Sequence, residues 1–209
     1  MHRVGIVLYN GVDEFEVTAP MDILCSCRKS EKGHWTEHPA FSVKTVADNL
    51  AAVETSHGLA LMPQGIFGQT SDLDILIIPG GPGARLQRYP MSLLDWLVSV
   101  SRQSKTVVSL STAAFILARS GMLSHRRVTT YPAFVADIRR IEPTATVEGN
   151  DRVVSDDGGA LLSTSGISQS VDAALAVIEK YEGLRSAEIA AKRIGWPINI
   201  ADIVPVYST

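Results

Sequence analysis

The stretch VVSLSTAAF at residues 107–115 joins a β-branched run to an alanine-rich run, with Ser111 and Thr112 at the junction. A sharp turn from a strand into a helix can hold one hydroxyl at the edge of a sheet, where the next backbone N–H stabilises a developing negative charge. Serine and threonine are also favoured helix N-caps, and the glycines of the pattern GxSxG are absent. The junction is therefore a candidate nucleophile or an ordinary helix cap, and a nucleophile also needs a base.

Candidate proton carriers lie in GVDEFEVTAPMDIL, residues 11–24, which contains Asp13, Glu14, Glu16 and Asp22. Acidic residues at the start of a helix interact favourably with the helix dipole, and this role alone explains their presence. Glu16, however, lies between two apolar residues, and burial there would raise its pKa and let it carry a proton. Histidine offers no clear alternative base, because all five histidines lie in turn-like or polar stretches: His2, His34, His38, His57 and His125.

A third stretch, IIPGGPGA at residues 77–84, contains three glycines and two prolines. Glycines permit tight turns whose backbone N–H groups can bind an anion or a developing oxyanion. The stretch does not match GxGxxG, and it lacks the lysine and the serine or threonine of a phosphate-binding P-loop. It is therefore a candidate oxyanion hole or a plain exit from a strand.

The elements that must position these stretches follow from apolar runs bounded by turn signals. Runs without alternation predict strands buried on both faces, separated by helices, and this order favours a mostly parallel sheet with helices on both faces. Because ligands bind beyond the carboxyl ends of such strands, the three stretches should meet at one edge. A lighter group of strand signals, 127–131 and from 146 onward, predicts an antiparallel extension. The expected strands are 4–9, 41–47, 73–81, 106–111 and 159–166, and the expected helices are 16–29, 91–103, 112–122 and 167–181.

Composition predicts one domain over residues 1–209, since 209 residues with 45% hydrophobic content can bury a single core. The segment 195–209, GWPINIADIVPVYST, is expected to pack as a short C-terminal extension on the domain or on a partner subunit.

Net charge −3 disfavours nucleic acid and membrane surfaces as partners, and no signal peptide or membrane span is evident, so we expect a cytoplasmic protein. Cys25 and Cys27 are expected to be buried structural thiols that form neither a disulfide framework nor a zinc site.

Taken together and in this order, the three stretches resemble the ThiJ/PfpI superfamily, over about residues 3–185. These proteins are flavodoxin-like relatives of class I glutamine amidotransferases and include the parkinsonism-associated deglycase. The resemblance implies a flavodoxin-like three-layer sandwich with Glu16 at the position of the active-site carboxylate. It places Gly80 in the substrate-binding glycine turn, and it makes the backbone N–H of Gly81 part of an oxyanion hole.

Residues 109–131, SLSTAAFILARSGMLSHRRVTTY, resemble the pattern SVCTGAFLLAxAGLLxGRRATTHW. That pattern belongs to the branch with isocyanide hydratases and the sensor-like domains of certain transcription regulators. Ser111 stands where the family carries its reactive cysteine, and Thr112 matches this branch. Ala113 replaces a glycine and is expected to narrow the turn and to contact the substrate. Tyr131 replaces a histidine and is expected to line the substrate pocket.

The resemblance implies an isocyanide-hydratase-like enzyme that adds water to a small electrophilic carbon-nitrogen substrate and releases an N-substituted formamide. Ser111 would be the nucleophile, Glu16 the general acid and base, and Gly81 and Thr112 the backbone donors. The resemblance implies no metal or organic cofactor, and it implies a homodimer. Two alternatives remain open: a non-catalytic small-molecule-binding protein, and a biosynthetic enzyme that uses Glu16 without a covalent step. A natural serine and a laboratory Cys-to-Ser replacement at position 111 look the same in a sequence.

Overall fold

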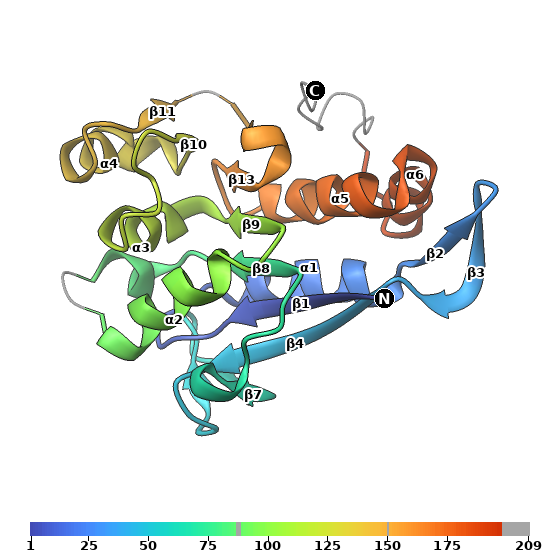
Figure 1. The fold of residues 1–209 in the computed structure, drawn as a ribbon, viewed down its shortest axis with the longest axis horizontal. Helices are drawn as coiled ribbons and strands as arrows, with labels where there is room; N and C mark the ends of the chain where they lie inside the picture. Colours follow the sequence, from blue (N-terminus) through green and yellow to red (C-terminus); the bar gives the residue numbers. More distant parts are fainter. Residues whose placement is uncertain (87–88, 150, 198–209) are drawn as a thin grey trace.

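A computed structural model describes residues 1–86, 89–149 and 151–197, so most of the predicted C-terminal extension, 198–209, lies outside the described residues. Its centre is a seven-stranded sheet in the order β12-β13-β9-β8-β1-β4-β7, most of which can be followed from top to bottom in Figure 1. Neighbouring strands are parallel except β12 and β13, which confirms the prediction of a mostly parallel sheet. The strands are β1 (His2–Val7), β4 (Phe41–Ala47), β7 (Gly65–Ile66), β8 (Ile75–Ile78), β9 (Thr106–Ser109), β12 (Val153–Asp156) and β13 (Leu161–Thr164).

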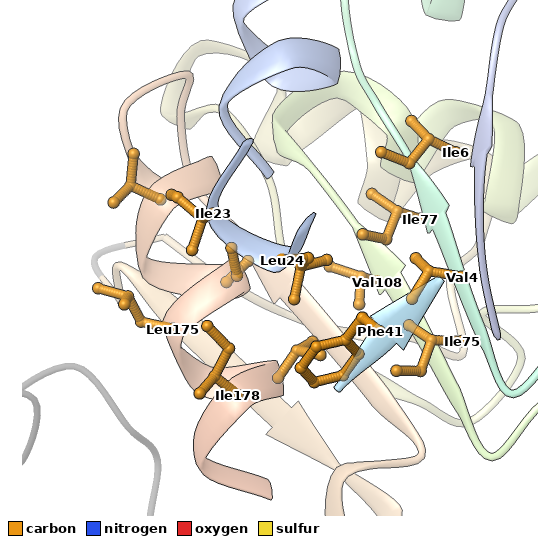
Figure 2. Packing of buried hydrophobic residues seen from close by; sticks show 14 of the residues in the cluster. Val4, Ile6, Ile23, Leu24, Phe41, Ile75, Ile77, Val108, Leu175 and Ile178 are labelled. Atoms are coloured by element: carbon orange, nitrogen blue, oxygen red, sulfur yellow. The ribbon is translucent and has the colours of Figure 1, made fainter. Parts of the chain in front are cut away.

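Helices cover both faces of the sheet. Successive side chains of each central strand point to opposite sides, so each face presents apolar side chains that helices bury. Along β1, Val4 and Ile6 enter one core with α1, α5 and α6, whereas Val7 enters the other core with α2, α3 and α4. Figure 2 shows Leu24 of α1 and Leu175 of α5 in the first core. This arrangement is the predicted three-layer sandwich. The helices are α1 (Glu14–Ser26), α2 (Met91–Ser101), α3 (Ala114–Arg119), α4 (Val135–Ile141), α5 (Gln169–Glu182) and α6 (Leu184–Arg193).

The predicted antiparallel extension is only partly correct. β12 is joined to β13 by a short turn, and a tight connection of this kind imposes the antiparallel pairing that is observed. The other segment forms β10 (Arg127–Thr129), which pairs in parallel with β11 (Thr146–Glu148) in a separate two-stranded sheet. α4 lies between these two strands in the chain, and a helical crossover of this kind returns the chain in the same direction.

Short elements complete the fold at both edges of the sheet. A hairpin of β5 (Val53–Glu54) and β6 (Ala60–Leu61) lies next to the end of β1, as the bridge between Val12 and Thr55 shows. A second hairpin is formed by β2 (Arg28–Glu31) and β3 (His34–Pro39). The 3-10 helices are η1 (Phe67–Gln69), η2 (Pro82–Arg85), η3 (Ser111–Ala113), η4 (Pro132–Phe134) and η5 (Asp157–Gly159).

Both cysteines are free thiols, but their environments differ. Cys27 is buried after the end of α1, as expected, and burial raises its pKa to about 12. The expected burial is wrong for Cys25, which is exposed. Successive helical residues point about 100° apart, so Cys25 is turned away from the core that its neighbour Leu24 enters.

Among the described residues no helix is long and apolar enough to cross a membrane.

Candidate active site

Ser111 occupies a strained turn between β9 and α3. Its φ of +49° lies in the left-handed region, which non-glycine residues rarely adopt and which clusters at functional sites. Two threonines distant in the chain hold this turn: the Ser111 N–H donates to Thr164 Oγ1 at 3.1 Å, and Thr130 Oγ1 donates to the Ser111 carbonyl at 2.9 Å. Ala113, not Ser111, occupies the N-cap position of α3, so Ser111 is not the ordinary cap of that helix.

Glu16 is fully buried in the first turn of α1. The turn is fixed by Asp13, whose carboxylate accepts hydrogen bonds from the N–H groups of Phe15 at 3.0 Å and Glu16 at 3.2 Å. Glu16 Oε2 accepts a bond from the Gly80 N–H at 2.5 Å, whereas its buried Oε1 has no hydrogen-bond partner among the described residues.

The protonation state of Glu16 follows from this environment. Burial is the main cause that raises the pKa of Glu16 to about 8, and the negative charge of Asp13 acts in the same direction. The Gly80 N–H and the Ser111 hydroxyl lower the pKa, but they do not offset the burial. A carboxyl group with this pKa is mostly neutral at pH 7, so Glu16 can donate a proton in the pocket.

The glycine turn touches the Ser111 turn through Thr112. The Gly81 N–H donates to Thr112 Oγ1 at 2.9 Å, and Thr112 Oγ1 donates to the Gly81 carbonyl at 3.1 Å. Gly81 has a φ of +120°, and a Cβ on Gly80 would lie 2.7 Å from Thr112 Oγ1, so both glycines are needed for this close approach. The hydroxyl oxygen of Thr112 already accepts the hydrogen bond of the Gly81 N–H. A developing oxyanion can therefore use that N–H only by displacing the threonine hydroxyl.

A pocket of about 300 Å³ opens over these residues at the carboxyl edge of the sheet. Two of the predicted substrate-binding residues do not line it. Gly80 lies behind Glu16, and Ala113 is fully buried in the core beside α2 and α3. Five predicted site residues do line the pocket: Glu16, Gly81, Ser111, Thr112 and Tyr131.

The outer wall of the pocket is largely aromatic and apolar. It is formed by Tyr131, Phe134 and Ile167, and the guanidinium of Arg85 lies over the Phe134 ring at 4.9 Å from its centroid. Tyr131 is 45% exposed, which leaves its ring available to a ligand. The wall suits an apolar substituent, while the floor at Glu16 supplies a proton donor.

Sequence reasoning missed Ser56 and His57 at the mouth of this pocket. They lie in the turn between β5 and β6, which packs against the start of α1 through a bond from the Ser56 N–H to the Val12 carbonyl at 2.8 Å. His57 Nδ1 lies 2.7 Å from Glu14 Oε1 although the two residues are 43 positions apart. No local pattern predicts this contact, because it depends on where the hairpin docks.

No group of three or more metal-ligating side chains occurs among the described residues.

Comparisons with known proteins agree with the predicted resemblance. The model of the DJ-1/PfpI family matches residues 2–180. The isonitrile hydratase of Pseudomonas putida is 29% identical over 188 residues, which is 90% of this chain and 75% of the relative. Protein dj-1beta of Drosophila melanogaster is 25% identical over 144 residues, 68% of this chain and 74% of the relative.

Solved structures share the fold. A ThiJ/PfpI family protein from Pseudomonas syringae has a TM-score of 0.81 at 20% identity, covering 94% of this chain and 76% of that one. An AraC family transcriptional regulator from Pseudomonas putida has a TM-score of 0.77 at 19% identity, covering 93% of this chain and 100% of that one. The family match over most of the length, the three-layer fold and the Glu16–Ser111 pocket agree, and the chain belongs to the DJ-1/PfpI family.

Proposed function

We propose that this protein adds water to a small isocyanide and releases an N-substituted formamide. The observation that carries the proposal is a carboxyl group, Glu16, whose pKa is about 8 and which shares a small pocket with Ser111 in a strained turn. The likeness to an isonitrile hydratase over 90% of the chain supports the same reaction class. The apolar wall of the pocket suits the organic substituent of such a substrate.

The first half of the reaction joins the substrate to Ser111. Neutral Glu16 donates its proton to the terminal carbon of the isocyanide, and Ser111 Oγ forms a bond to the same carbon. The hydroxyl proton then passes to the Glu16 carboxylate, which becomes neutral again. The product of this half is an imidate ester in which Ser111 Oγ is bonded to a CH=N group that carries the substituent.

This order of events explains how a serine could serve at the position where the resemblance implies a cysteine. A carboxylate is a weak base for an alcohol, so Glu16 is poorly suited to ionise Ser111 in advance. Protonation of the isocyanide carbon makes it electrophilic first, and the hydroxyl can then attack before it loses its proton. By analogy with other oxyanion holes, the Gly81 N–H would contribute about 3 kcal/mol only after the Thr112 hydroxyl releases it, and the Thr112 N–H would contribute about the same amount.

The second half releases the product. Water adds to the imidate carbon, the imidate nitrogen gains a proton, and the bond between that carbon and Ser111 Oγ breaks. The added oxygen becomes the carbonyl oxygen of the formamide, and the serine hydroxyl is restored. This half needs a base for the attacking water as well as an acid for the nitrogen and the departing oxygen.

The experiment that tests the proposal measures formamide formation from cyclohexyl isocyanide by chromatography and mass spectrometry. We expect turnover by the unaltered chain and a loss of at least about 100-fold in Ser111→Ala and in Glu16→Gln, since a nucleophile and a general acid each contribute that much or more. Ser42→Ala and Glu188→Gln change exposed residues outside the pocket and should retain full activity. Full activity in Ser111→Ala with loss in Glu16→Gln would instead favour the version without a covalent step.

A second candidate is a ligand-binding protein without turnover. The observation that favours it is the bond between the Gly81 N–H and Thr112 Oγ1, which occupies a donor that catalysis would need. In that case neither the unaltered chain nor Ser111→Cys would form formamide, while calorimetry would detect binding of a small apolar ligand. Formamide production by Ser111→Cys alone would identify the same pocket as that of a hydratase silenced by its serine.

A further inference from the structure

The mouth of the pocket contains a second group of proton-transferring side chains. Glu14 Oε1 lies 2.7 Å from His57 Nδ1, and Ser56 Oγ donates to Glu14 Oε2 at 3.1 Å. Ser56 Oγ also lies 3.0 Å from His57 Nδ1, so the three side chains form one cluster. Ser56 and His57 line the same pocket as Glu16 and Ser111.

The cluster orients the imidazole of His57. Both of its hydrogen-bonded neighbours contact Nδ1, and no residue in the described part of the chain bonds to Nε2. An acceptor carboxylate at one ring nitrogen favours the tautomer with its proton there, which leaves the other nitrogen as a base. The side chain of His57 is 72% exposed and that of Glu14 only 19%, so a partly buried carboxylate positions an accessible ring.

Three other titratable groups in the pocket, those of Asp13, Arg85 and Glu16, are less suited to act on water. The carboxylate of Asp13 is buried and already accepts two backbone hydrogen bonds at the start of α1. Arg85 holds a guanidinium, which does not deprotonate in proteins. Glu16 lies at the buried end of the pocket and is neutral after the first half of the proposed reaction.

We propose that His57 is the base for the attacking water in the second half of the reaction, with Glu14 and Ser56 as positioning residues. This inference rests on the proposed function, because it assigns the release of the imidate that forms on Ser111. His57 is then a proton carrier at the mouth of the pocket, where water enters, in addition to Glu16 at the buried end.

The proton transfers balance. His57 Nε2 takes a proton from water as the water oxygen bonds to the imidate carbon, and Glu16 gives its proton to the imidate nitrogen. When the bond to Ser111 Oγ breaks, the His57 imidazolium protonates that oxygen. The hydroxyl proton on the former imidate carbon passes to the Glu16 carboxylate, which leaves a formamide and restores all three side chains.

The experiment compares His57→Ala with His38→Ala, which changes an exposed histidine outside the pocket. With cyclohexyl isocyanide we expect kcat to fall about 100-fold in His57→Ala only, a typical effect of removing a general base. Intact mass spectrometry should show the adduct on Ser111 accumulating in that variant, and imidazole added to the buffer should restore part of the rate. A kcat in His57→Ala within twofold of His38→Ala would overturn the assignment.

The positioning role of Glu14 has its own readout. In the ¹⁵N spectrum of the imidazoles, Glu14→Gln should shift the His57 resonances toward the other tautomer. Because only the second half of the reaction is slowed, kcat and KM should fall together and kcat/KM should stay unchanged. The matched change Glu188→Gln, on the exposed surface of α6, should alter neither. Unchanged His57 resonances in Glu14→Gln would overturn the role of Glu14.

A second probe separates this inference from the proposed function. p-Nitrophenyl acetate can acylate a reactive serine without isocyanide chemistry, and hydrolysis of the acyl group again needs a base for water. If the unaltered chain forms no formamide but loses the acyl group much faster than His57→Ala does, the proposed function fails and the role of His57 stands. Equal rates of acyl loss in the two proteins would overturn the role of His57.

Discussion

At the scale of single residues, the environment of the Glu16 carboxyl group sets the pH range in which it can work as an acid. Burial raises its pKa to about 8, so its neutral form predominates below that pH and disappears above it. If Glu16 donates the proton in the first half of the reaction, kcat/KM for formamide formation should fall as the pH rises through about 8, because kcat/KM reports the pKa of the free protein. A pH–rate profile between pH 6 and 9.5 checks this, and a rate that rises through this range would contradict it.

Some residues of the pocket can be recognised from the sequence, and others cannot. Local neighbours make Glu16 and Ser111 candidates only, the resemblance assigns their roles, and the structure places both in one pocket. The polar neighbours of His57 give no local sign of a catalytic base, and its position depends on the docking of a hairpin that no periodicity encodes. The bond between the Gly81 N–H and Thr112 Oγ1 was equally invisible, because it joins two turns 31 residues apart.

At the scale of elements, Gly80 is where the glycine turn approaches the turn after β9. A Cβ there would lie 2.7 Å from Thr112 Oγ1 and 2.9 Å from the Leu110 carbonyl oxygen. We expect Gly80→Ala to force the two turns apart, to cost about 1–3 kcal/mol of unfolding free energy as other overpacked sites do, and to abolish turnover.

The matched control for Gly80→Ala is Gly68→Ala, because a Cβ on Gly68 would meet nothing within 4 Å. Urea unfolding and the formamide assay should show little change in that variant. If Gly80→Ala were as stable and as active as Gly68→Ala, the close packing of the two turns would not matter for the pocket.

Element types were predictable where the pattern is unambiguous. β8 and β9 are buried along their whole lengths, and such runs between turn signals indicate central parallel strands. The partner of a short strand is less predictable. The segment around β10 carries an ordinary strand signal, but its pairing with β11 depends on the helix between them and on the edge already taken by β12.

At the scale of the whole molecule, one buried carboxylate joins three distant parts of the chain. Asp172 in α5 is fully buried and accepts hydrogen bonds from Arg152 at 3.1 and 2.7 Å and from Trp196 Nε1 at 2.9 Å. Removal of Arg152 would leave a buried charge with less compensation. We therefore expect Arg152→Ala to lower the free energy of unfolding by about 3 kcal/mol, as measured by urea denaturation.

The control for Arg152→Ala is Arg193→Ala, which breaks an exposed pair with Asp22 at 3.6 Å. Exposed pairs contribute about 0–1 kcal/mol, so this variant should unfold almost as the unaltered chain does. Equal destabilisation by the two changes would mean that the hydrogen bonds of Asp172 with Arg152 and Trp196 do not stabilise the fold.

The assembly of the whole molecule stays a prediction from the resemblance. A homodimer would sediment with a mass near twice the 22.5 kDa of the chain. Sedimentation velocity at several protein concentrations measures this directly. A single species with the mass of the chain across the concentration range would contradict the prediction.

The proposed proton donation requires that Glu16 stays neutral at pH 7 beside Ser111. The most direct measurement is a carboxyl ¹³C titration of protein labelled at glutamate, with Glu16→Gln used to assign the resonance. We expect a resonance that titrates with a midpoint near pH 8 and is absent from the variant. A Glu16 midpoint near the ordinary value of about 4.3 would mean that the carboxyl is ionised at pH 7, and it would contradict the proposed proton donation.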